Sequence, residues 1–260
     1  MSDFQRCNIK AMGRDTSSAV ALQHLMGPAA LKSLEASDRD RLESARWLVR
    51  TIGKGKSIID QGETRESIFI LLSGWAFRSQ TLSDGKRQIL DFVFAGTLLG
   101  FGSCKTNSYG VETVTECRVA SLSILQFKRL LSQSPALAIE VAERLCDSEM
   151  RAHEHMTSLG RRNARERIAG LVVELAARTP IHAKHSLHCS LELPVTQVMI
   201  GDALGLSNEH VCRVIGKLAE AGVIGFAGQT LEVLDQHALL REAGYSEEEA
   251  HSAKLLAIAA

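Results

Sequence analysis

Residues 193–224, LPVTQVMIGDALGLSNEHVCRVIGKLAEAGVI, constrain the fold of this 260-residue chain more than any other stretch. Their apolar positions recur every three or four residues on both sides of a glycine, the pattern of two short helices joined by a tight turn. Thr196 stands where it can cap the first helix, and Ser207 where it can cap the second. Gly205 supplies the turn and Leu206 plugs it. The stretch therefore predicts a helix-turn-helix.

The two faces of the second helix carry different kinds of side chain. The predicted inward positions of the two helices are all apolar: Ile200, Ala203 and Leu204, then Val211, Val214, Ile215 and Leu218. At about 100° per residue, the opposite face of the second helix carries polar groups and a glycine: Glu209, Arg213, Gly216, Lys217 and Glu220. Glu209 and Arg213 lie nearest the helix start, the end that usually enters the major groove of DNA.

The chemistry of these two side chains suits DNA bases. Arg213 can donate two bonds to guanine O6 and N7, and Glu209 can accept from a cytosine amino group. The alternative is an ordinary exposed ion pair four residues apart, worth only a few tenths of a kcal/mol. The capped and correctly phased helix pair favours a DNA-reading helix. The other residues of the predicted interface are Thr196, Gln197, Ser207, Asn208, Cys212 and Lys217.

Short β-type runs separated by glycines fill the chain between about Trp47 and Leu125. The runs are SIID, SIFILLSG, WAFRSQT, QILDFVF, VETVT and RVASLSI. Strands this short, with turn signals about every 8–12 residues, predict an all-β roll or barrel. Asp84-Gly85 is the best hairpin turn among them. We assign 1–30 to an N-terminal arm with a short helix near 19–26, and 31–132 to the roll.

A long helix is predicted next, because Ser134-Pro135 begins a glycine-free stretch that runs to Leu159. Its seam, at three- and four-residue steps, consists of Leu137, Val141, Leu145, Ser148, Ala152, His155 and Leu159. Such a seam packs either on its own domain or on the same helix of a second subunit. A helix of about 25 residues exposed between two domains favours the dimer. A dimer also suits DNA reading, because a two-fold protein reads two half-sites on one face of the duplex. We assign 133–162 to this dimerisation helix.

The rest of the chain, 163–245, is expected to form a winged helix-turn-helix, followed by a tail at 246–260. A helix from Asn163 to Arg178 precedes the helix-turn-helix, and GFAGQTLEVLD follows it as a small hairpin turning at Gly228. The 30 basic and 30 acidic side chains give a formal net charge of zero, which argues against a basic protein overall. We therefore expect a local basic surface from Arg161, Arg162, Arg165, Arg167 and Arg178.

Simpler patterns argue against a membrane-spanning or secreted protein and against an enzyme. No apolar run is long enough to span a bilayer, and Asp3, Arg6 and Lys10 do not fit a secretory signal, so we expect a cytoplasmic protein. Its six cysteines show no C-x-x-C pair, and no structural disulfide is expected. An enzyme is disfavoured, because no nucleophile–base pair, phosphate-binding glycine loop or carboxylate dyad stands at a persuasive spacing.

With roll, long helix and winged helix-turn-helix in this order, the chain resembles the CRP/FNR family of bacterial transcription regulators over roughly 42–239. The motifs that carry the resemblance are KGKSIIDQGE, SIFILLSGWAF, FAGTLLGF and LPVTQVMIGDALGLSNEHVCRVIGKL. The resemblance implies an α+β fold with an N-terminal β-roll, the double-stranded β-helix of cyclic-nucleotide-binding domains. It also implies a homodimer that binds double-stranded DNA and contacts RNA polymerase.

The recognition helix of this family commonly reads E-x-x-S-R or E-x-x-G-R, and Glu209, Cys212 and Arg213 stand in those places. Cys212 is a departure. E-x-x-C-R and FAGTLLGF are closer to the FNR/FixK branch than to the cAMP branch. That similarity implies a TTGAT-like inverted repeat, with Glu209 and Arg213 reading its inner G·C pairs.

The effector residues of the family do not transfer to this chain. Members that bind cAMP use a glycine-glutamate pair and a downstream Arg-Ser, but GTLLGFGSCKTNSYGVETV has neither a glutamate after Gly100 nor an Arg-Ser pair. A buried phosphate with no cation opposite it would be costly. Iron–sulfur members use clustered N-terminal cysteines and one in the roll. Here the arm offers Cys7 alone, Ala120 stands near the fourth position, and Cys117 is three residues too early. No cofactor is predicted.

Two further groups of residues invite sharper hypotheses. Cys212 lies beside Arg213 near a helix start, and both features favour a reactive thiolate. Its oxidation would block DNA docking; the alternative is a small residue tolerated beside a phosphate. His182, His185, His188 and Cys189 are weak metal-ligand candidates, because their spacing matches no zinc signature and solvated histidines explain them better.

Two functions remain open at this stage. The first is a sequence-specific, DNA-binding transcription regulator. The second is a sensor module of the same fold that responds to a small molecule in the roll and acts through protein contacts. The outward face that carries Glu209 and Arg213 favours the first.

Overall fold

The computed structural model describes residues 14–34, 36–178, 191–227 and 230–245. The described chain packs as two compact units. The first comprises the described residues up to Arg78 together with Val93–Ser148, and the second comprises Ser79–Phe92 together with the described residues from Glu149 onward. The predicted limits of the arm, roll, long helix, DNA-binding region and tail stay predictions.

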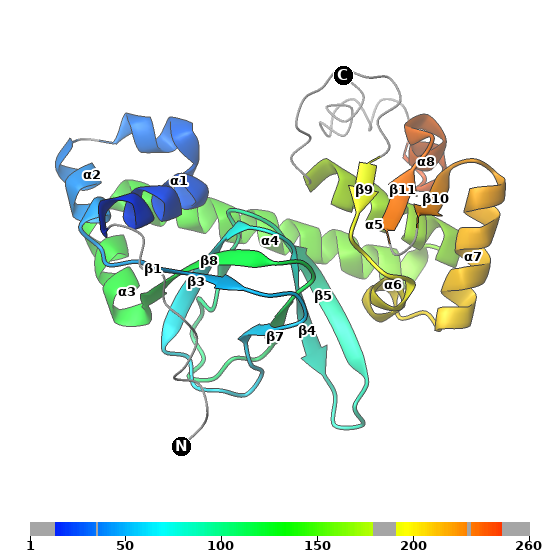
Figure 1. Ribbon diagram of the computed structural model, residues 1–260, viewed down its shortest axis with the longest axis horizontal. Coiled ribbons are helices and arrows are strands. Elements are labelled where there is room, and N and C mark those ends of the chain that lie inside the picture. The colour runs from blue at the N-terminus through cyan, green and yellow to red at the C-terminus, as the bar shows by residue number, and fades with distance from the viewer. Residues whose placement is uncertain (1–13, 35, 179–190, 228–229, 246–260) are drawn as a thin grey trace. The chain divides into compact units, whose positions relative to one another are not determined.

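Two four-stranded sheets form the roll (Figure 1). One has the order β1 (Leu48–Ile52), β8 (Cys117–Ser123), β3 (Ser67–Ser73), β6 (Leu98–Leu99), and the other the order β2 (Ser57–Ile59), β7 (Gly110–Thr113), β4 (Ala76–Thr81), β5 (Arg87–Val93). All six predicted runs become strands, whereas β1 and the two-residue β6 were missed. The predicted turn at Asp84-Gly85 joins β4 to β5, with Gly85 at φ 83° and the Asp84 carboxylate accepting from the Lys86 amide.

Strand β3 is buried on both faces, and this explains its unbroken apolar run. Ile68, Ile70 and Leu72 pack in a core shared with the helices of the first unit, whereas Leu71 points into the interior of the roll beside Val119. Because successive strand residues point to opposite faces, one strand serves both cores. The roll is therefore covered by helices along the sheet that contains β3.

The first helix, α1 (Arg14–Ser33), corrects the expected N-terminal arm. The sequence predicted only a short helix near 19–26 in an otherwise irregular segment. Instead, Ala21, Leu22 and Leu25 are fully buried in the core that contains β3. Their three- and four-residue spacing gives α1 an apolar stripe that must be covered. Within 14–33 the segment belongs to the folded unit.

Two more helices of the first unit were not predicted: α2 (Ala36–Glu43) and α3 (Ile124–Gln133). Helix α3 follows β8 directly. Ser123 caps its first turn, because the Ser123 hydroxyl accepts a hydrogen bond from the Gln126 amide. Phe127 of α3 is fully buried in the same core as α1. Helix α2 packs against both α1 and α3 (Figure 1).

The long helix is confirmed as α4 (Pro135–Arg161), but residues toward both ends of its predicted seam contact the chain itself. Leu137 and Val141 are buried in the core of the first unit, and His155 bonds through Nε2 to the carbonyl of Ala203. These parts of the seam pack on the chain itself, the alternative that the sequence disfavoured, whereas Leu145 is 46% exposed and Ala152 is also exposed. Apolar side chains do lie exposed on the opposite side of α4, and Ile139 and Met150 are 60% and 68% exposed.

The second unit contains the predicted helices and wing. Its elements are α5 (Ala164–Arg178), β9 (Leu191–Leu193), α6 (Gln197–Leu204), α7 (Asn208–Glu220), β10 (Ile224–Ala227), β11 (Thr230–Val233) and α8 (Gln236–Glu242). The strands form a sheet of order β10-β11-β9, so the wing hairpin is confirmed, although its predicted turn at Gly228 lies outside the described residues. None of the helices so described is both long and apolar enough to cross a membrane.

The burial of α1 gives a direct test of its place in the core. Replacing the fully buried Leu25 by alanine should cost about 2–5 kcal/mol of unfolding free energy, because it leaves a cavity between helices. Leu125→Ala is the matched control, because that side chain is 69% exposed and should change the free energy by less than about 0.5 kcal/mol. Urea unfolding followed by the fluorescence of Trp47 and Trp75, both in the first unit, measures the two effects. Equal effects would show that α1 is peripheral.

Candidate nucleic-acid interface

Side-chain caps and one left-handed residue define the turn between α6 and α7. The Thr196 hydroxyl accepts from the Met199 amide at 3.2 Å, and the Ser207 hydroxyl accepts from the His210 amide at 3.3 Å. Gly205 ends α6 at φ 64°, a conformation that costs glycine little. These three local predictions are confirmed. The caps fix where each helix starts, and each capping hydroxyl accepts there while it keeps its own hydrogen for another acceptor.

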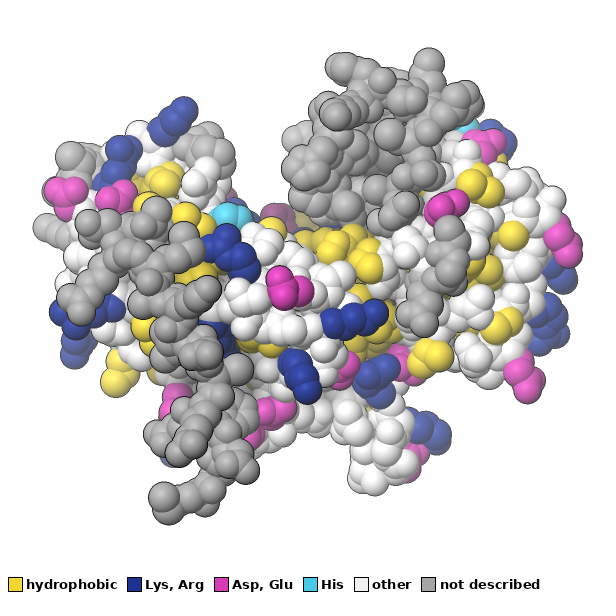
Figure 2. Space-filling model, viewed as in Figure 1, with side chains coloured by type: hydrophobic (Ala, Val, Ile, Leu, Met, Phe, Trp, Pro, Cys, Tyr) yellow, Lys and Arg dark blue, Asp and Glu magenta, His cyan; other side chains and the backbone are white. Residues whose placement is uncertain are grey.

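The phase of α7 is set by four buried side chains. Val211, Val214, Ile215 and Leu218 are at most 8% exposed, as their spacing predicts. The opposite side of the helix is open to solvent and carries Glu209, Cys212, Arg213, Lys217 and Glu220. Figure 2 shows basic and acidic side chains interspersed over α7. The predicted outer face is therefore confirmed as a mixed-charge, exposed surface.

Glu209 and Arg213 make no ion pair or hydrogen bond with any residue that the structure describes. The ordinary exposed pair between them, which was the alternative explanation of their spacing, is absent from this conformation. Both charged groups are thus available to an external partner with complementary donors and acceptors.

One contact joins the two helices on this exposed side. The Cys212 thiol donates to Oε1 of Gln197, the first residue of α6, at 2.6 Å. The two were predicted separately as interface residues, but side-chain contacts between helices cannot be derived from spacing within one helix. The amide nitrogen of Gln197 retains its two hydrogens for other acceptors. Asn208 and Lys217 lie exposed at opposite ends of α7.

The glycines of this region differ in the structural reason that requires a glycine at each position. A Cβ on Gly201 would lie 2.8 Å from the carbonyl oxygen of Leu206, so only glycine lets the turn close on α6. Gly205 and Gly222 have positive φ. Gly216 has neither reason, since nothing lies within 4 Å of an added Cβ. In the interior of a helix such a glycine costs about 1 kcal/mol relative to alanine.

The expected basic surface between 161 and 178 is wrong, because most of its arginines are paired within the chain. Arg162 lies 2.7 Å from Glu154, and Arg165 donates two bonds to Glu242. The second pair holds the pKa of the Glu242 carboxyl below its usual range, chiefly through the bonds from Arg165. Arg178 bonds to Asp91 and Glu174. Sequence position alone does not reveal partners that lie up to 87 residues away.

The segment between β6 and β7 does not fit a cyclic nucleotide. At the place of the ribose-binding glutamate stands Phe101, which packs edge-on against Phe127 at 5.5 Å between ring centres. The structure also shows a cation that the sequence missed. The Arg65 guanidinium reaches this segment and bonds to the carbonyl of Thr106 and the side chain of Asn107. The segment's own atoms thus engage Nε and Nη2 of this guanidinium, whereas Nη1 is buried and has no hydrogen-bond partner among the described residues.

The cysteine nearest the family's roll ligand does not fit an iron–sulfur cluster. Cys117 is fully buried, and its thiol donates to the carbonyl of Trp75. Burial raises the pKa of this thiol to about 11, so it is a neutral core group and not a thiolate ligand. The weak metal candidates His182, His185, His188 and Cys189 lie outside the described residues. Among the residues that are described, no three potential ligands gather.

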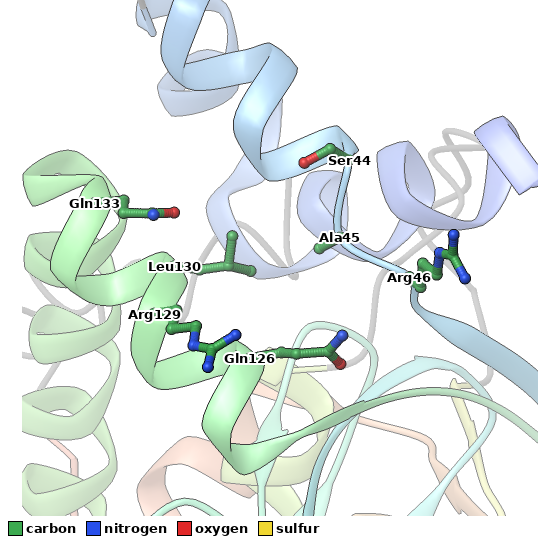
Figure 3. Close-up of a pocket in the computed structure, with 7 residues that line it drawn as sticks. All are labelled: Ser44, Ala45, Arg46, Gln126, Arg129, Leu130 and Gln133. Atoms are coloured by element: carbon green, nitrogen blue, oxygen red, sulfur yellow. The ribbon is translucent and has the colours of Figure 1, made fainter.

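A pocket of about 270 Å³ lies on the first unit, between the connection from α2 to β1 and the helix α3 (Figure 3). Its lining residues are Ser44, Ala45, Arg46, Gln126, Arg129, Leu130 and Gln133. The pocket draws on no residue of α6 or α7. It is separate from the exposed face of the helix-turn-helix.

Comparisons with known proteins agree with this architecture. Residues 49–134 match the cyclic nucleotide-binding domain, and residues 166–242 match the Crp-like helix-turn-helix domain. The chain is 30% identical to the nitrogen fixation regulation protein FixK of Rhizobium meliloti over 222 residues, which are 85% of this chain and 93% of that protein. It is 31% identical to the transcriptional activator protein FnrA of Stutzerimonas stutzeri over 219 residues, which are 82% and 87% of the two chains.

A solved structure extends the comparison to three dimensions. The structure of FixK2 from Bradyrhizobium japonicum superposes with a TM-score of 0.69 at 24% identity, over 77% of this chain and 98% of that one. The match covers the order of β-domain, long helix and winged helix-turn-helix that the sequence predicts. From its domains, its relatives and its fold, this chain belongs to the CRP/FNR family of DNA-binding transcription regulators.

Proposed function

We propose that this regulator binds a TTGAT-like inverted repeat as a homodimer, with Glu209 and Arg213 of each subunit reading base edges. The observation that carries the proposal is the exposed face of α7, where both side chains are charged and without a partner among the described residues. Arginine recognises guanine through two acceptors, and glutamate accepts from the amino group of cytosine. Thr196, Gln197, Ser207, Asn208, Cys212 and Lys217 surround them as candidate phosphate or base contacts.

The exposed side of α4 supports the proposal that the protein is a homodimer. Ile139, Ala142, Cys146, Met150 and His153 recur at three- and four-residue steps and are all exposed, on the side opposite Leu137 and Val141. Exposed apolar side chains at this spacing form the contact of a parallel helix pair. A symmetric dimer would present two copies of α7 to two half-sites.

The remaining partners follow from regulation of transcription. We infer that the DNA-bound dimer acts on RNA polymerase and that it works in the cytoplasm, where its DNA lies. The sensor-module alternative, which would act through protein contacts, draws no support from the segment between β6 and β7, since that segment does not fit the family's nucleotide.

Replacing Arg213 or Glu209 by alanine should remove sequence discrimination. Wild-type protein should prefer a TTGAT–N4–ATCAA duplex to one with its inner G·C pairs replaced, and each variant should lose about five- to 150-fold of that preference. Fluorescence anisotropy titrations at one fixed salt concentration measure both affinities. Glu220→Ala, on the same exposed face but at the far end of α7, is the control. Unchanged preference in both variants would contradict the assignment of these side chains.

Introducing charge on the exposed stripe of α4 should separate the subunits. The double variant Ile139→Glu, Met150→Glu places like charges opposite each other in the proposed dimer, so we expect monomers in size-exclusion chromatography with light scattering. Operator affinity should fall at least about tenfold, because one half-site is lost. Leu125→Glu, at an equally exposed apolar position on α3, is the control. A double variant that remains dimeric would reject α4 as the interface.

Oxidation of Cys212 provides a test between its two explanations. Hydrogen peroxide would convert the thiol to a sulfenic acid, with formation of an S–O bond, cleavage of the O–O bond and release of water. If added size and charge block docking, peroxide should abolish operator binding by wild-type protein and spare Cys212→Ser. Equal losses in the two proteins would end the redox hypothesis and leave a small residue tolerated beside a phosphate.

A further inference from the structure

Gly216 stands out because the protein itself gives no reason for it. The other glycines of the helix-turn-helix are required by close backbone contact at Gly201 or by positive φ at Gly205 and Gly222. Gly216 lies within α7, and nothing lies within 4 Å of the Cβ that any other residue would bring. Alanine would strengthen the helix at this position. No described residue therefore accounts for the glycine.

The position of Gly216 on the helix indicates where an explanation lies. At about 100° per residue, Gly216 is within about 20° of Glu209 and about 60° of Arg213, viewed along the helix axis. It follows Arg213 by three residues and Cys212 by four, so it forms the next patch of the same exposed face. The buried stripe of Val211, Val214, Ile215 and Leu218 lies on the other side.

We propose that Gly216 is a contact point with the sugar-phosphate backbone of DNA, where the absence of a side chain lets the strand pass against the main chain of α7. The proposal rests on the proposed function and adds a positioning residue to it. If the start of α7 enters the groove, residues two turns further along approach the groove wall, which is formed by phosphates. A side chain at 216 would crowd the strand at that wall and weaken the backbone contact on any duplex, while Glu209 and Arg213 keep facing the same bases.

The test uses a size series at this position in the full chain. Gly216→Ala and Gly216→Leu should both raise the thermal unfolding midpoint by a few degrees, because both residues favour a helix. Operator affinity should nevertheless fall by about threefold and about thirtyfold, respectively, in the order of side-chain size. Ala177→Leu, at an exposed position of α5, is the control and should leave affinity unchanged.

The pattern of the loss distinguishes backbone contact from base reading. A phosphate contact weakens all duplexes equally, so the ratio of affinities for the TTGAT operator and its G·C-replaced version should stay as in wild type. Arg213→Ala should lower that ratio, and this contrast separates the two failures. If Gly216→Leu binds as tightly as wild type, or if its loss is confined to the intact operator, the inference is overturned. If wild type itself shows no preference, the proposed function fails and this inference with it.

Discussion

The burial of four aliphatic side chains on α7 is the constraint on which the rest of the interface depends. Because Val211, Val214, Ile215 and Leu218 must face the body of the second unit, the helix has only one rotation about its axis. That rotation exposes Glu209 and Arg213 together and places Gly216 between them and the helix end. Closure of the turn on Gly201 then fixes α6 against the start of α7. The charged groups owe their direction to apolar packing.

Two sides of one helix have similarly separate tasks in α4. Leu137 and Val141 anchor it to the core of the first unit, and the stripe with Ile139 and Met150 is exposed and, in our proposal, contacts a second copy. The basic side chains of the second unit also include two groups, those paired within the chain and those exposed on α7. Arg162, Arg165 and Arg178 form ion pairs within the chain. Arg213 and Lys217, by contrast, are exposed on α7. In the proposed function, recognition depends on a few placed groups and not on a broad positive surface.

The sequence predicts the strongly periodic parts of this fold well. The caps Thr196 and Ser207, the buried stripe of α7, six strands and the long helix all follow from local spacing. Failures arose where the deciding contact is distant. The tertiary packing that buries Leu25 of α1 is invisible to local polarity, and the partner of Arg165 lies 77 residues away. The seam of α4 was misjudged because periodicity shows that a face is apolar but not what covers it.

The most direct measurement of the central claim removes a single acceptor from the DNA. Replacing guanine by 7-deazaguanine at the inner G·C pairs deletes N7, one of the two atoms to which the Arg213 guanidinium would donate. Wild-type protein should lose about tenfold in affinity for the modified operator, and Arg213→Ala should bind modified and unmodified operators equally. An equal loss in both proteins, or no loss in wild type, would contradict the claim that Arg213 reads this base.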